Sequence, residues 1–288
     1  AAELDVDFIA ISFVRDAGHI RTLRGQLQNR NCSARIVSKI EDQEAVKHLS
    51  EIIEESDAVM VARGDLGIEV YLEELPIVQR TILKECARIG RKVIVATHML
   101  ESMIENPVPT RAEVTDVANA VYEQADAVMV SGETSVGRYP VKCIEVLDRI
   151  ATRMEREPGA GFSRQIELSN EKQFTVKSAV VLANSLENSS LVIFTARGVL
   201  ANYAAHQRPE RADIFAFCPD EKIGRALLMN RGVTPFRMDF ASQPEESIRI
   251  AIDFLKEKGL VETGNPVVIV SDVLNREFDT GAILLRKA

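Results

Sequence analysis

The 288-residue chain has no tryptophan, and aromatic side chains make up only 5% of it. Its core must therefore be built from aliphatic residues, chiefly Val, Ile, Leu, Ala and Met. Basic residues are outnumbered, because 35 Lys and Arg stand against 43 Asp and Glu, which gives a net charge of −8. A net negative surface repels phosphate backbones, so we expect no nucleic-acid partner.

Long apolar runs are also absent. No stretch approaches the roughly 20 apolar residues needed to span a bilayer, so we expect no membrane partner. The first residues, AAELDVD, are acidic where a signal peptide is basic. The four cysteines, Cys32, Cys86, Cys143 and Cys218, lie far apart without metal-ligand spacing, which is typical of buried reduced thiols. Together these features predict a globular protein of the cytoplasm.

Short, nearly continuous runs of Val, Ile and Ala recur along the first half of the chain. They are typical of parallel strands that are covered on both faces. The runs occupy residues 8–13, 35–40, 58–62, 92–97 and 127–131. They are separated by stretches with helical periodicity, and no Rossmann glycine pattern is present. Five such βα units predict the last five units of a (β/α)8 barrel, and the alternative is an open sheet.

A break follows at the residues EPGAG, 157–161, where Pro and Gly end the last helix. Beyond it, a further set of alternating strands and helices predicts a smaller α/β domain. Strands are expected at 191–195, 213–217, 234–238, 267–271 and 282–286, and helices at 171–186, 199–206, 220–231 and 244–258. We therefore predict a partial TIM barrel over 1–157, a linker over 158–170 and a C-terminal α/β domain over 171–288.

In a βα barrel, functional side chains lie where strands end and βα loops begin. Lys39 and Glu41 are two residues apart at the end of the second expected strand, so they emerge on the same side. A Lys and a Glu together suit a site that holds both a cation and an anion. The alternative is a surface ion pair that caps the next helix.

The sequence RGDLG, residues 63–67, follows the third expected strand. Two glycines that flank an acid let the backbone turn tightly and bring N–H groups close to a ligand. Asp65 then offers a hard oxygen ligand that suits Mg²⁺. The alternative is a plain turn in which Asp65 is a helix N-cap.

Three further groups occur at strand ends. The Thr97 hydroxyl is placed to bind a substrate oxygen or relay a proton, although such hydroxyls more commonly bond the local backbone. Ser131 and Glu133 repeat this pattern after the last strand of the barrel portion. His98 is a candidate general base, but a lone His is more often structural, so its role stays open.

Five motifs, in order, resemble the pyruvate kinase family. They are IVSKIE at 36–41, VMVARGDLGIE at 59–69, ATHMLESM at 96–103, PTRAEVTDVANA at 109–120 and MVSGET at 129–134. The resemblance implies the later part of the catalytic barrel followed by the regulatory C-terminal domain. It also implies phosphoryl transfer from phosphoenolpyruvate to ADP, which gives pyruvate and ATP, with Mg²⁺ and K⁺ as cofactors. An allosteric homotetramer is implied too, with Arg111 near a subunit interface.

The resemblance assigns roles to the charged candidates. Lys39 matches the lysine that neutralises charge on the phosphoryl group in flight and on the enolate. Glu41 and Asp65 match the carboxylates that hold the catalytic Mg²⁺. The backbone at Gly64 and Asp65, with the Thr97 hydroxyl, matches the binding site for the carboxylate of phosphoenolpyruvate.

The resemblance also assigns the step in which the enolate is protonated. Ser131 and Glu133 match positions near the proton-delivery network. The chain departs from the family at His98, where the family usually has Gln. The expected effector loop, with Thr195, Arg197 and Gly198, lacks the Ser/Thr-rich phosphate cradle of members activated by sugar bisphosphates. Its companion segment is acidic, with Asp272, Glu277 and Asp279, so activation by fructose 1,6-bisphosphate is not predicted.

Two other functions remain open on the residues. One is a Mg²⁺-dependent aldolase or lyase that acts on a pyruvate enolate, and the other is a non-catalytic association or effector-binding fragment. Five strands are fewer than the eight that close a barrel. The family's nucleotide and K⁺ contacts also lie mainly in the other three units and an inserted domain. We therefore expect the 288-residue chain alone to be inactive, while residues 171–288 fold independently.

Overall fold

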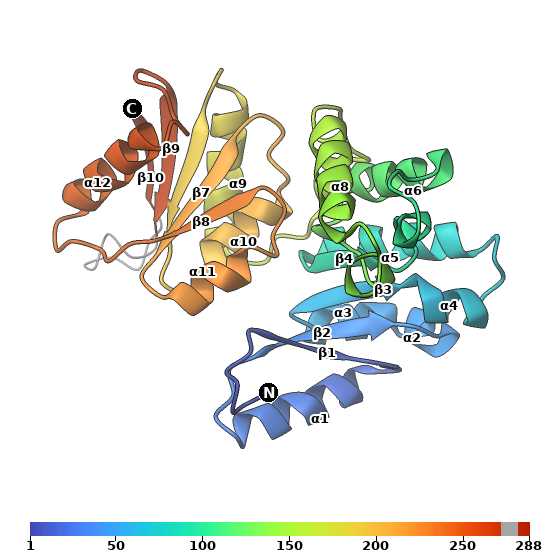
Figure 1. Cartoon of the computed structure of the whole chain (residues 1–288). Coiled ribbons are helices and arrows are strands. Elements are labelled where there is room, and N and C mark those ends of the chain that lie inside the picture. Colours follow the sequence, from blue (N-terminus) through green and yellow to red (C-terminus); the bar gives the residue numbers. More distant parts are fainter. Residues whose placement is uncertain (272–281) are drawn as a thin grey trace. The chain divides into compact units, whose positions relative to one another are not determined.

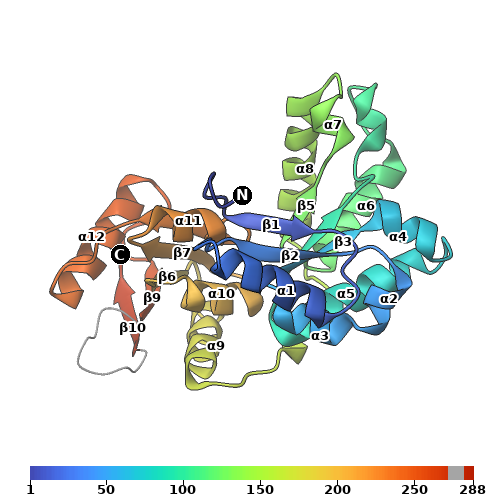
Figure 2. The ribbon, with the colours of Figure 1, turned by 90° about the horizontal axis from the view of Figure 1, so that it is seen from below.

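The computed structural model describes residues 1–271 and 282–288, so the acidic segment with Asp272, Glu277 and Asp279 lies outside the described residues. The chain divides into two compact units, residues 1–166 and 167–288 (Figures 1 and 2). The first unit holds a five-stranded parallel sheet in which each strand pairs with the next one along the chain. Its strands are β1 (Phe8–Ile11), β2 (Arg35–Ile40), β3 (Ala58–Ala62), β4 (Lys92–Ala96) and β5 (Ala127–Met129). This order confirms the expected run of five βα units.

Helices form the connections between these strands. They are α1 (Ala17–Gln28), α2 (Gln43–Lys47), α3 (Leu49–Glu55), α4 (Arg63–Glu69), α5 (Leu75–Ile89), α6 (Arg111–Tyr122), α7 (Gly132–Ser135) and α8 (Pro140–Met154), with short 3₁₀ turns η1 (Glu101–Ile104) and η2 (Phe162–Gln165). Local signals set several ends. Gly90 takes φ 76° where α5 ends, and α6 begins with a capping box between Thr110 and Glu113.

One face of the first sheet packs against these helices. Alternate strand residues such as Ile36 and Val59 join the hydrophobic core that includes Ile53 of α3 and Ile82 of α5. Side chains alternate along a strand, so Lys39 projects from the opposite face of β2. That face is also largely apolar, since Val37, Met60 and Ile94 are buried on it, so Lys39 is a charged exception at its end.

The second unit is a three-layer α/β structure. Its strands are β6 (Ser190–Phe194), β7 (Asp213–Cys218), β8 (Val233–Arg237), β9 (Pro266–Ser271) and β10 (Ala282–Lys287), in the order β10-β9-β6-β7-β8, with β10 antiparallel. On one face lie α9 (Glu171–Asn184), α10 (Val199–His206) and α11 (Glu221–Leu227), and on the other lies α12 (Pro244–Glu257). Both faces of β6 are therefore buried, as its continuous apolar run predicts. None of the described helices is long and apolar enough to cross a bilayer.

The largest differences from the expected elements occur after β3, β4 and β5. The RGDLG segment is the start of α4 rather than a tight turn. β4 ends at Ala96 and β5 at Met129, so neither Thr97 nor Ser131 belongs to a strand. Thr97 leaves the strand because its φ is 73°, which is incompatible with β structure.

A buried cation at the start of β4 supports a prediction about stability. Lys92 is 5% exposed, and burial lowers its pKa from 10.5 to about 8, although the charge of Asp126 opposes the shift. Because the folded-state pKa lies below the unfolded one, burying the ammonium opposes folding at pH 8 and below. We expect Lys92→Met to raise the free energy of unfolding at pH 7 by about 3 kcal/mol.

The increase in the free energy of unfolding of Lys92→Met should depend on pH, and this dependence identifies the buried ammonium as its cause. As the pH rises from 8 to 10.5 the folded state releases the proton before the unfolded state does, so the advantage of the Met variant should fall progressively, to below about 1 kcal/mol at pH 10. Urea denaturation followed by far-UV circular dichroism at pH 7 and pH 10 measures it. Lys84→Met, at an exposed position on α5, is the control and should show no such change. A gain that is equal at both pH values would contradict the prediction.

Candidate active site

Lys39 and Glu41 form an ion pair where β2 ends. Lys39 Nζ lies 2.5 Å from Glu41 Oε1, and it also donates a hydrogen bond to Ser12 Oγ at 3.0 Å. The Glu41 side chain is 1% exposed and that of Lys39 is 24% exposed. The pair is therefore not the surface ion pair that was left open, because its anion is buried and only its cation reaches solvent. A partly exposed ammonium on a buried carboxylate leaves a positive group facing the open side of the sheet.

Glu41 also ties β2 to the loop after β1, since its Oε2 accepts a hydrogen bond from the Phe13 N–H at 2.6 Å. Its Oε1 is buried and meets Lys39 at ion-pair distance, but receives no hydrogen bond of good geometry. A buried carboxylate oxygen with unused acceptor capacity fits the hard oxygen ligands that Mg²⁺ prefers. Among residues 1–271 and 282–288 no group of three or more His, Cys, Asp or Glu side chains is placed to hold a metal. Mg²⁺ is commonly held by only one or two carboxylates together with substrate oxygens, so the residues fit it.

Asp65 lies in the first turn of α4, directly after β3. The helix N-cap is Ala62, so the alternative reading of Asp65 as an N-cap is wrong, and the Asp65 side chain is exposed. The first N–H groups of a helix have no partner within it. Gly64 is needed for close approach rather than for a turn, because a Cβ there would lie 2.9 Å from Thr97 Cγ2. The start of α4 and Thr97 are therefore in contact.

Thr97 and His98 form a turn in the left-handed region directly after β4. Their φ values are 73° and 55°, and neither residue is a glycine. Such a conformation costs of the order of 1–3 kcal/mol per residue, and it is least favourable for a β-branched side chain such as Thr. The His98 side chain is 58% exposed and lies 3.8 Å from Glu101. His98 is therefore not a buried structural histidine.

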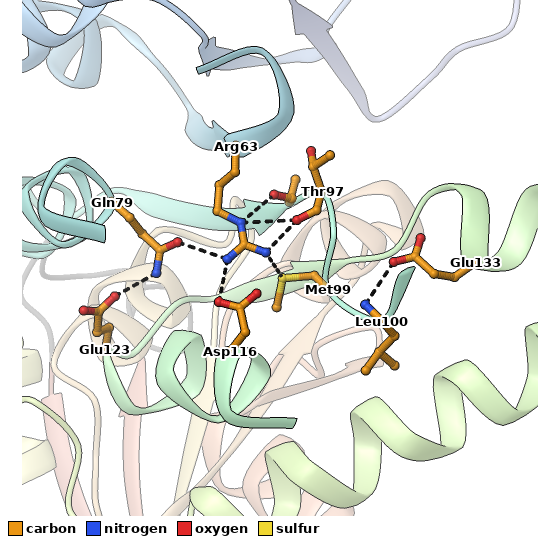
Figure 3. Close-up of polar contacts among 9 residues, drawn as sticks. Arg63, Gln79, Thr97, Met99, Leu100, Asp116, Glu123 and Glu133 are labelled. Atoms are coloured by element: carbon orange, nitrogen blue, oxygen red, sulfur yellow. Dashed lines mark hydrogen bonds and ion pairs between the residues drawn. The ribbon is translucent and has the colours of Figure 1, made fainter. Parts of the chain in front are cut away.

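Arg63, the first residue of α4, holds this turn in place (Figure 3). Its Nη2 donates to the Thr97 carbonyl oxygen at 2.6 Å, and its Nε donates to the carbonyl oxygens of Ala96 and Thr97 at 3.1 and 3.2 Å. On the other side, Nη1 lies 2.7 Å from Asp116 Oδ1 of α6. The guanidinium thus connects the ends of β3 and β4 to α6.

Glu133 joins the loops after β4 and β5 (Figure 3). It is buried, and its two carboxylate oxygens accept hydrogen bonds from the N–H groups of Leu100, at 3.1 Å, and Ser131, at 2.7 Å. Ser131 itself is exposed. The carboxylate of Glu133 therefore holds backbone in place, and the Ser131 hydroxyl is the member of the pair that faces solvent.

The expected effector loop lies in the second unit, between β6 and α10. Thr195 is fully buried, and its hydroxyl accepts a hydrogen bond from the Gly198 N–H at 3.1 Å, while Gly198 takes φ 79°. Arg197 is exposed. The Thr195 hydroxyl is thus committed to the shape of the loop, and Arg197 is the residue of the three that presents a side chain to solvent.

The structure brings Lys39 and Glu41 together and places Gly64 against Thr97. Arg63 lies within the RGDLG motif, but neither its role nor that of the Phe13 N–H was predicted from the sequence. A charged residue directly after a wholly buried strand is a weak signal for a buried arginine. Its partners lie 16 to 53 residues away along the chain, so the sequence offers no means to identify them.

Comparisons with known proteins agree with the geometry. Residues 1–144 match the family model described as "Pyruvate kinase, barrel domain", and residues 173–281 match "Pyruvate kinase, alpha/beta domain". The chain is 40% identical to the chloroplastic pyruvate kinase isozyme G of Ricinus communis, over 98% of this chain and 68% of that protein. It is 41% identical to plastidial pyruvate kinase 2 of Arabidopsis thaliana, over 93% of this chain and 47% of that protein.

A solved structure is similar over nearly the whole chain. The crystal structure of a pyruvate kinase from Cryptosporidium parvum superposes with a TM-score of 0.91 at 32% identity, covering 99% of this chain and 59% of that one. The chain therefore spans between about half and two thirds of the length of these relatives. The expected cytoplasmic location is wrong by this comparison, because the plant relatives are named chloroplastic or plastidial.

Proposed function

Since this chain belongs to the pyruvate kinase family, we propose that the complete protein transfers a phosphoryl group from phosphoenolpyruvate to ADP and protonates the resulting enolate to pyruvate. The observation that carries the proposal is the partly exposed Lys39 ammonium held on the buried Glu41 carboxylate at the end of β2. Phosphoryl transfer depends mainly on positioning and on charge stabilisation, and a fixed cation at a strand end supplies both.

Lys39 is the group that neutralises negative charge in this proposal. Its ammonium is fixed by Glu41 and Ser12, so it does not need to reorganise when charge develops on the phosphoryl oxygens and the enolate oxygen. The same contacts keep it oriented toward the open side of the sheet, where the substrate would bind.

Glu41 and Asp65 would hold Mg²⁺, through the free acceptor capacity of Glu41 Oε1 and the exposed carboxylate of Asp65. The ion would act as a Lewis acid on the phosphoryl and enolate oxygens. We also propose K⁺ as a second cofactor, from the family resemblance alone. The protein's own part is to present hard oxygen ligands next to the Lys39 cation.

The carboxylate of phosphoenolpyruvate would bind between α4 and Thr97. The backbone N–H groups at Gly64 and Asp65 are at the start of a helix, where they have no partner within it. Thr97 contacts Gly64 through its methyl group, and its hydroxyl oxygen lies 3.8 Å from where a Cβ at Gly64 would stand. The proton that converts the enolate to pyruvate would come through the exposed Ser131 hydroxyl, with Glu133 holding Ser131 in place.

Assembly and regulation are proposed from the family resemblance, and location from the names of the relatives. A homotetramer with Arg111 near an interface follows from the resemblance, as does an effector site at the loop of Thr195, Arg197 and Gly198. Only Arg197 among these presents a side chain to solvent, which supports an anionic effector. A plastid location follows from the names of the plant relatives.

A coupled assay that measures ATP and pyruvate separately tests the proposal on the complete protein. Equal amounts of both products from phosphoenolpyruvate and ADP are expected. Pyruvate without ATP would indicate transfer of the phosphoryl group to water instead of ADP. Neither product would leave the aldolase and the non-catalytic role, which are separated by whether the protein releases pyruvate from a 4-hydroxy-2-oxo acid in the presence of Mg²⁺. The 288-residue chain alone, assayed in parallel, should form neither, because the remaining barrel strands are missing from it.

A further inference from the structure

Arg63 makes the contacts that hold the Thr97–His98 turn in place. Two consecutive residues other than glycine are in the left-handed region there, so something outside the turn must stabilise it. The guanidinium binds the carbonyl oxygens of Ala96 and Thr97, and Nη2 also lies 2.9 Å from Met99 Sδ. The Arg63 side chain therefore contacts the chain before the turn, at Ala96, within it, at Thr97, and after it, at Met99.

The guanidinium has no N–H group left for a substrate. Nε is shared between two carbonyl oxygens, Nη2 contacts Thr97 and Met99, and Nη1 contacts Asp116 and, at 3.5 Å, Gln79 Oε1. An arginine beside an anion site would ordinarily be assigned to the anion. Here its five donors are all directed at the protein, and the residue is 9% exposed. Its role must therefore be exerted through the groups that it holds.

The arginine is itself fixed by a buried polar network (Figure 3). Gln79 of α5 is buried and donates to Glu123 Oε2 at 2.9 Å, and Glu123 is 1% exposed. Arg80 donates to the other Glu123 oxygen at 2.8 Å. Together with Asp116 on α6, these contacts give the buried charges of Arg63 and Glu123 polar partners. They fix the orientation of the guanidinium.

We propose that Arg63 is a positioning residue that sets the Thr97 hydroxyl against the backbone of Gly64 and Asp65, through the Thr97 carbonyl. Arg63 supplies both parts of this arrangement, because its own backbone begins α4 and its side chain holds Thr97. Thr97 is close to Gly64, as a Cβ at Gly64 would lie 2.9 Å from Thr97 Cγ2 and 3.8 Å from its hydroxyl oxygen. The proposal rests on the proposed function in so far as Thr97 and Gly64 bind phosphoenolpyruvate.

The first test is a double-mutant cycle in the complete protein. Arg63→Lys keeps the charge but loses the planar fork, so it cannot bind Thr97 and Asp116 together. A displacement of about 1 Å can lower catalysis roughly 100-fold, so we expect kcat/KM for phosphoenolpyruvate to fall about 10- to 100-fold. In a Thr97→Ala background, Arg63→Lys should cost less than about threefold more, because its effect passes through Thr97. Multiplicative effects, or full activity of Arg63→Lys, would overturn the proposal.

The second measurement does not depend on activity. Hydrogen exchange of the backbone amides of residues 97–101 should be faster in Arg63→Lys, while Arg88→Lys, a matched change in an ion pair on α5, should leave both exchange and turnover unchanged. If Arg63→Lys does not fold, Asp116→Asn loosens the same guanidinium from α6 and should show both effects more weakly. Unchanged exchange in these variants would refute the positioning role. Absence of ATP and pyruvate from the unmodified protein would refute the proposed function alone.

Discussion

Replacing Lys39 with Met in the complete protein should lower kcat about 100- to 1,000-fold, the loss that follows removal of one preorganised electrostatic contact. The physical reason is that the ammonium meets developing negative charge from a position already fixed by Glu41 and Ser12. The variant should still fold, because Glu41 Oε2 retains its hydrogen bond from Phe13, but its thermal midpoint should fall, because the buried Glu41 carboxylate loses its charge partner. The assay is the coupled production of ATP and pyruvate, with the thermal midpoint by circular dichroism as the measure of folding.

Two comparisons make the Lys39 result specific. Lys47→Met, at an exposed position on α2, removes a similar charge and should leave turnover unchanged. The Mg²⁺ concentration for half-maximal activity should not rise in Lys39→Met, since the ammonium repels the metal ion rather than binding it. Near-normal turnover by Lys39→Met would refute the assignment of this lysine.

Replacing Glu41 with Gln should raise the half-saturating Mg²⁺ concentration about 10- to 100-fold. Even residues that only orient metal ligands typically change affinity by that factor, and Glu41 offers a ligand oxygen directly. Oε1 is buried with unused acceptor capacity, so the amide removes the anionic ligand while keeping the shape of the side chain. A Mg²⁺ titration of activity measures the effect, and Asp65→Asn should move the midpoint in the same direction.

The control for this titration is Glu44→Gln, on the surface of α2, which changes the same net charge away from the strand end. Its half-saturating concentration should equal that of the unmodified protein. If neither Glu41→Gln nor Asp65→Asn shifts the midpoint, these residues are not the metal ligands, and the family roles assigned to them do not hold for this chain.

The short apolar runs were sufficient to place β2 and β3 at their observed bounds, because a strand buried on both faces needs such a run and little else. The spacing of Lys39 and Glu41 was sufficient to predict that they share a face, because side chains alternate along a strand. The 2.5 Å ion pair agrees with that expectation. These are local properties, set by residues one or two positions apart.

What the sequence determined, then, is the strand and helix pattern, the fold class and the family, all of which follow from local periodicity and contiguous motifs. The tertiary structure alone decided that RGDLG begins a helix, that Thr97 is left-handed and that Arg63 is buried beneath it. The reason is the range of the interactions. Arg63 and Asp116 are 53 residues apart, and only the tertiary structure brings the start of α4 and the helix α6 together, so that their side chains lie 2.7 Å apart.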